Sequence, residues 1–138
     1  MKINLKRINE NFCFEAGNED GNKFLIDTGK SNGGDGNGFS PMQLLLVGIG
    51  GCSAIDIVSI LKKQKQEITD FEIEVEADRE KVEEHSVWKN IVLHFKLKGK
   101  IDLAKAERAA QLSHDKYCSV SKELEHSSNI SFKVSVGQ

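Results

Sequence analysis

Hydrophobic and polar residues alternate along the first 28 residues, in short stretches separated by turn-forming residues. An alternation with a period of two is typical of strands that have one buried face. A hairpin turn is predicted at Asn9-Glu10, and Asp20-Gly21 marks a second turn. The N-terminal strands therefore fall within residues 2–28, at about 2–8, 11–16 and 23–28.

A nearly continuous apolar stretch follows, from Leu44 to Leu61. Ser40 is a good N-cap and Pro41 suits the first helical position, so we expect a long helix over about residues 40–65. The stretch approaches the length of a membrane span, but Asp56 and several glycines interrupt it. We predict a buried core helix and no membrane insertion.

The remaining residues combine alternating stretches with one helical pattern. They predict a hairpin over about 70–99 with its turn near Glu84-His85-Ser86, and a last strand over about 130–136. Asp102 is the expected N-cap of a helix over about 102–117. Either Ser119 or Ser121 is expected to cap a short helical turn after it.

Clustered strands, rather than strands alternating with helices, favour an α+β fold with mostly antiparallel sheets and a long central helix. The length of 138 residues suits a single domain over residues 1–138. One small sheet cannot cover so apolar a helix, so we expect two chains to associate around it as a homodimer.

The composition narrows the possible partners and location. The net charge is -2, with acidic and basic residues interspersed, which gives no basic surface for nucleic acid. No signal peptide is apparent after Met1. The number of cysteines, three, is odd, which does not suit a framework of paired disulfides. We therefore expect a cytoplasmic protein.

Two of the cysteines are the main candidates for chemistry. Cys52 lies in the middle of the long helix, where no free backbone amides stabilise a thiolate. Cys118 follows the second predicted helix and has His114 and Lys116 nearby, a setting that favours the thiolate. Each cysteine also has a purely structural interpretation as a small buried residue, and Cys13 is interpreted only in that way.

The segments around these cysteines, SPMQLLLVGIGGC and SHDKYCSVS, occur in the same order as in a known family. Over essentially the whole chain, the sequence resembles the OsmC/Ohr family of thiol-dependent peroxidases, and within it a divergent OsmC-like branch. The resemblance implies an OsmC-like fold and an intertwined homodimer with its sites at the interface. It also implies a peroxidatic Cys52, a resolving Cys118, a hydroperoxide substrate, a dithiol reductant and no cofactor.

One position departs from the peroxidase pattern implied by this resemblance. The family's peroxidases place a glutamate ten residues before the first cysteine, where this chain has Met42 followed by Gln43. Arg7 is the weak candidate for the family's substrate-binding arginine. Phe39 and Leu45, together with Met42 and Gln43, are the expected lining for an organic hydroperoxide.

Two alternatives follow from the same residues. The first is a dimer without peroxidase activity that binds a small apolar or thiol-containing ligand, which Met42 favours. The second is a zinc site formed by Cys52, Cys118 and His114, whose donor atoms suit that ion. No CxxC or HxxxH spacing supports the second alternative, so no metal is predicted.

Overall fold

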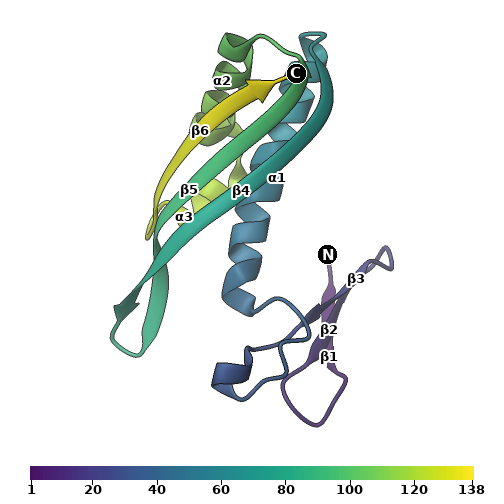
Figure 1. The fold of residues 1–138 in the computed structure, drawn as a ribbon. Helices are drawn as coiled ribbons and strands as arrows, with labels where there is room; N and C mark the ends of the chain where they lie inside the picture. Colours follow the sequence, from purple (N-terminus) through teal and green to yellow (C-terminus); the bar gives the residue numbers. More distant parts are fainter. The chain divides into compact units, whose positions relative to one another are not determined.

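The computed structural model describes all 138 residues and divides the chain into two compact units, residues 1–46 and 47–138. It contains two three-stranded sheets and three α-helices (Figure 1). The predicted α+β fold class is therefore confirmed.

The first unit contains an antiparallel sheet in the order β1-β2-β3. Its first hairpin connection spans residues 8–13, so the predicted two-residue turn at Asn9-Glu10 is wrong. The Asn9 side-chain oxygen accepts hydrogen bonds from the backbone N–H groups of Asn11 and Cys13, at 3.0 and 3.1 Å, and this organises the wider loop. The strands are β1 (Ile3–Arg7), β2 (Phe14–Asn18) and β3 (Lys23–Ile26), followed by the 3-10 turn η1 (Lys30–Asn32).

Helix α1 (Pro41–Lys63) begins at the predicted residue. The Ser40 hydroxyl accepts from the Gln43 N–H at 3.4 Å, and the Gln43 side chain accepts from the Ser40 N–H at 3.0 Å. This reciprocal pair is a capping box, which satisfies two of the N–H groups that have no partner within a helix.

One face of α1 is buried and the other is not. The buried residues recur every fourth position, at Ile49, Ser53, Ile57 and Leu61. A Cβ at Gly50 would lie 3.2 Å from a methyl carbon of Val75, so the missing side chain allows the helix to approach strand β4 (Glu67–Val82).

The opposite face of α1 remains open in the single chain. Ile55 is 72% exposed, and only 28% of the most apolar 18-residue stretch of α1 is buried. The helix was predicted to be buried, and it is buried on one side only. By length and composition alone, α1 is also apolar enough to cross a membrane, a test that core helices of soluble proteins pass as well.

The second unit is built on the sheet β4-β5-β6. Alternate residues of β5 (Ile91, Leu93, Phe95 and Leu97) form its buried core. The hairpin turn lies at Glu83-Glu84, slightly before the predicted site, and Glu83 has a positive φ of 56°. The strands are β4 (Glu67–Val82), β5 (His85–Lys100) and β6 (Asn129–Gly137).

Strand β6 runs parallel to β5, which is the one parallel pairing in otherwise antiparallel sheets. A parallel neighbour requires a crossover connection, and here this connection carries the remaining helices. These are α2 (Leu103–Leu112), the π-helical turn η2 (Ser113–Tyr117) and α3 (Ser119–Leu124). Figure 1 shows α1, α2 and α3 on the same face of this sheet.

The caps of the crossover helices explain where they begin. The Asp102 carboxylate accepts from the Ala104 N–H at 2.9 Å, which confirms the predicted cap of α2. The sulfur of Cys118 caps α3 by accepting from the Ser121 N–H at 3.3 Å, so the predicted serine caps are wrong. This arrangement directs the Cys118 sulfur toward the start of α3.

Candidate active site

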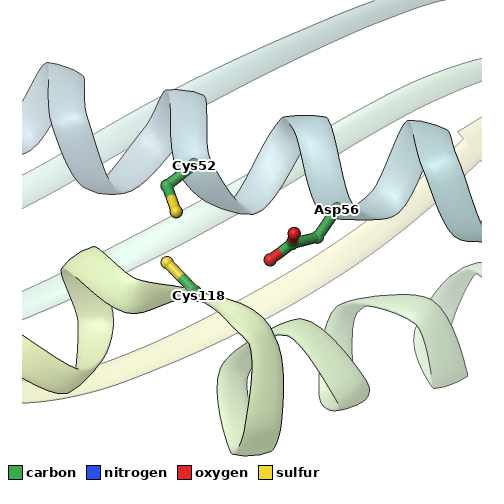
Figure 2. A group of neighbouring side chains, drawn as sticks. All are labelled: Cys52, Asp56 and Cys118. Atoms are coloured by element: carbon green, nitrogen blue, oxygen red, sulfur yellow. The ribbon is translucent and has the colours of Figure 1, made fainter.

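The sulfurs of Cys52 and Cys118 converge with the carboxylate of Asp56. One donor atom from each residue lies within 4.8 Å of the other two. Figure 2 shows Cys52 and Asp56 pointing from α1 toward Cys118, which lies at the turn before α3. Both cysteines are free thiols. Residues 66 positions apart in sequence thus form one cluster within residues 47–138.

The helix period and the π-helical turn produce this convergence. Cys52 and Asp56 are separated by four residues on α1, which places both side chains on one face. On the other side, the Cys118 N–H donates to the Ser113 carbonyl at 2.8 Å and closes the η2 turn. Single π-helical turns of this kind are frequent at functional sites.

Cys118 is completely buried, and its sulfur accepts two hydrogen bonds. The Ser53 hydroxyl donates to it at 3.5 Å, and the Ser121 N–H donates at 3.3 Å. Burial by itself raises the pKa of the Cys118 thiol, but hydrogen bonds from Ser121, Ser53 and Cys52 outweigh burial, and the pKa is lowered. The site therefore favours a thiolate on Cys118.

Cys52 is half-buried, and the pKa of its thiol is raised rather than lowered. Burial raises the pKa of its thiol, and the hydrogen bond to Cys118 and the charge on Cys118 raise it further. Backbone groups of Val120 and Ser119 partly oppose this shift. When the pair holds one proton, that proton is therefore favoured on Cys52, the less buried of the two residues.

Asp56 is fixed by its own chain. The Ser113 hydroxyl donates to Asp56 Oδ2 at 2.8 Å. Asp56 also lines a hollow of about 520 Å³, whose wall includes Lys63, Leu112 and Tyr117. A larger hollow of about 760 Å³ at the Lys100 end of the sheet includes no cysteine.

The other predicted site residues lie in the unit of residues 1–46. The Arg7 guanidinium donates to the carbonyl of Asn11 at 2.8 Å and to that of Glu10, and so helps to hold the first hairpin loop. The Gln43 side chain is engaged in the capping box. Phe39 and Leu45 are exposed, and Met42 lies in the first turn of α1.

Two serines were not among the predicted site residues. Ser53 donates to Cys118, and Ser113 donates to Asp56. A serine next to a cysteine carries no signal by itself, whereas the four-residue spacing of Cys52 and Asp56 is a signal that the two share one helical face. The structure groups Asp56, rather than His114, with the two sulfurs, and Cys13 is buried elsewhere, in the first unit.

Comparisons with known proteins agree with this architecture. Residues 34–133 match the family described as OsmC-like protein. Protein YhfA of Escherichia coli (strain K12) is 40% identical over 138 residues, covering 99% of this chain and 98% of that protein.

Solved structures extend the likeness to the fold. A protein of Aquifex aeolicus VF5 has a TM-score of 0.80 at 30% identity, covering 99% of this chain and 97% of its own. An organic hydroperoxide resistance protein of Legionella pneumophila has a TM-score of 0.74 at 21% identity, covering 99% and 98%. At 21% identity, the similarity to the Legionella pneumophila protein concerns the fold alone.

Proposed function

The chain belongs to the OsmC-like protein family, and we propose that it reduces organic hydroperoxides by a two-cysteine mechanism. The observation that carries the proposal is the approach of Cys52 and Cys118 to within 4.8 Å of each other. The substrate class is the one implied by the resemblance of the segments around these cysteines to the OsmC/Ohr peroxidases.

In the first step, the proton of Cys52 passes to the Cys118 thiolate as the Cys52 sulfur attacks the terminal peroxide oxygen. The O–O bond breaks, Cys52 becomes a sulfenic acid, and the alkoxide takes the proton back from Cys118 to leave as an alcohol. The half-buried Cys52 is the sulfur that a hydroperoxide reaches, whereas Cys118 is fully buried.

In the second step, the Cys118 thiolate attacks the Cys52 sulfenic acid. A sulfur–sulfur bond forms, the S–O bond breaks, and the hydroxide that leaves becomes water by taking up the proton that Cys118 released to solvent when it ionised. Two electrons have then passed from the two thiols to the peroxide. A cellular dithiol restores both thiols by exchange.

We also propose that the protein acts as a cytoplasmic homodimer. The support for a dimer is the open apolar face of α1, with Ile55 72% and Val47 51% exposed. A second copy is the occupant that the family resemblance implies. An apolar face of this kind on a soluble chain marks an interaction surface.

The test is the intact mass and peptide map of the reduced protein after one equivalent of cumene hydroperoxide, with a chelator present and under non-reducing conditions. The expected product has lost two hydrogens and contains a Cys52–Cys118 peptide pair. The Cys13→Ser variant is the matched control and should give the same product. Unmodified thiols, or random oxidation that includes Cys13, would contradict the proposal.

The second candidate function is a dimer that binds a small apolar or thiol-containing ligand without peroxide chemistry. It is favoured by Met42 at the position of the family's glutamate, since a thioether cannot anchor a guanidinium. A rise in thermal stability with such ligands, together with intact thiols after peroxide treatment, would select this function.

A further inference from the structure

We infer that the reduced protein binds one thiophilic divalent cation, with zinc the best fit, through Cys52 Sγ, Cys118 Sγ and the carboxylate of Asp56. This inference uses the thiols of the proposed peroxidase but does not require that they react with peroxide. Its basis is the mutual approach of the three donor atoms to within 4.8 Å.

The donor spacing suits a tetrahedral ion after a small contraction. Zinc–sulfur and zinc–oxygen bonds of about 2.3 and 2.1 Å place tetrahedral ligands roughly 3.5–3.8 Å apart. From the observed limit of 4.8 Å, each donor–donor distance must shorten by at most about 1.3 Å, which side-chain rotation provides. Two of the donors stand on adjacent turns of one helix, as in other metal sites built on helices.

The surrounding hydrogen bonds also suit a bound cation. The Ser113 hydroxyl holds Asp56 Oδ2 at 2.8 Å and leaves the second carboxylate oxygen available. The Cys118 sulfur already accepts from Ser53 and Ser121, and such donors stabilise a thiolate without occupying the metal position. Partners of this kind orient metal ligands and typically change affinity by about 10–100-fold.

Asp56 also lines the hollow of about 520 Å³, so a cation can approach the cluster from the Asp56 side. Three protein ligands leave the fourth tetrahedral position for water, as in open zinc sites. Two thiolates and one carboxylate around a divalent cation leave one net negative charge, and Lys63 lines the same hollow.

Metal binding and disulfide formation exclude each other at this cluster. Binding requires both cysteines as thiolates and releases their protons to solvent. A disulfide would remove two of the three ligands, so the metal site exists only in the reduced protein.

The test is anaerobic titration of the reduced, metal-free protein with Co²⁺, followed by displacement with Zn²⁺. We expect one equivalent to bind, with thiolate-to-cobalt charge-transfer absorption and the strong visible bands of a tetrahedral site. The charge-transfer absorption should weaken in Cys52→Ser and Cys118→Ser, and the affinity should fall at least tenfold in Asp56→Asn. Cys13→Ser should leave both unchanged.

Two outcomes would overturn the inference: no thiolate-to-cobalt absorption in the wild-type protein, or unchanged affinity in Asp56→Asn. Asp56→Asn is nearly isosteric and leaves the Cys118 cap of α3 intact, so it serves if Cys118→Ser does not fold. Peroxide oxidation is measured separately on chelator-treated protein. Its failure would reject the peroxidase and leave the cobalt result standing.

Discussion

The α1 segment around Cys52 and the turn around Cys118 shift the pKa of a thiol in opposite directions. The helix supplies solvent access to Cys52, but its own amides are already bonded within the helix. At the turn, Cys118 is completely buried, and its sulfur accepts hydrogen bonds from the Ser121 N–H and from the hydroxyl of Ser53 on α1. Access and thiolate stabilisation are thus divided between two segments.

In the proposed mechanism, this difference takes the place of the family's glutamate. A half-buried thiol with a raised pKa is a poor nucleophile alone, because the thiolate is the reactive species. A buried thiolate beside it can accept the proton at the moment of attack. The proposed chemistry then depends on both thiols. Each variant below removes one thiol or one contact of the pair.

The largest effect is expected on removing the accessible sulfur. Cys52→Ser should lower peroxide turnover by more than about 1,000-fold, because no other thiol in the cluster reaches the peroxide. A peroxidase assay with a dithiol reductant measures the loss, and Cys13→Ser is the control. Substantial activity in Cys52→Ser would assign the attack to a different residue.

Removing the buried sulfur of Cys118 should stop the proposed cycle after its first step. In Cys118→Ser we expect one equivalent of peroxide to be consumed slowly, leaving a Cys52 sulfenic acid that a dimedone-type reagent traps. Mass spectrometry of the trapped adduct gives the measurement. Sustained turnover in this variant would show that Cys118 is not the resolving thiol.

The titration of the pair should change between these variants. In Cys13→Ser, which removes the third thiol, the ultraviolet absorbance of the thiolates should rise in two steps, one below and one above the ordinary cysteine pKa, and Cys118→Ser is compared in the same background. In Cys118→Ser, the pKa of Cys52 should fall toward its ordinary value, since the raising effect of Cys118 is gone, but burial should keep it raised. An unchanged upper step would refute coupling between the thiols.

The sequence carried enough information for the architecture and for which cysteine favours the thiolate, but not for the donors that stabilise it. Alternation and caps located the strands, α1 and α2, because each depends on residues close together in the chain. The cap of α3 was mispredicted, because a cysteine sulfur rarely serves as an N-cap. The donation from Ser53 to Cys118 depends on how α1 packs against a turn 65 residues away, and no local pattern encodes that contact.

The smallest effect is expected at the contact that joins the two segments. Ser53→Ala removes one donor to Cys118, and a hydrogen bond of this kind contributes about 1 kcal/mol, or roughly fivefold. The rate of disulfide closure, measured by stopped-flow after peroxide addition, should fall by about that factor, and the lower titration step should move up in pH. Ser59→Ala, an exposed serine on the same helix, should change neither. If Ser53→Ala slowed closure without moving the titration, Ser53 would act by packing, and α1 would not stabilise the Cys118 thiolate through this hydroxyl.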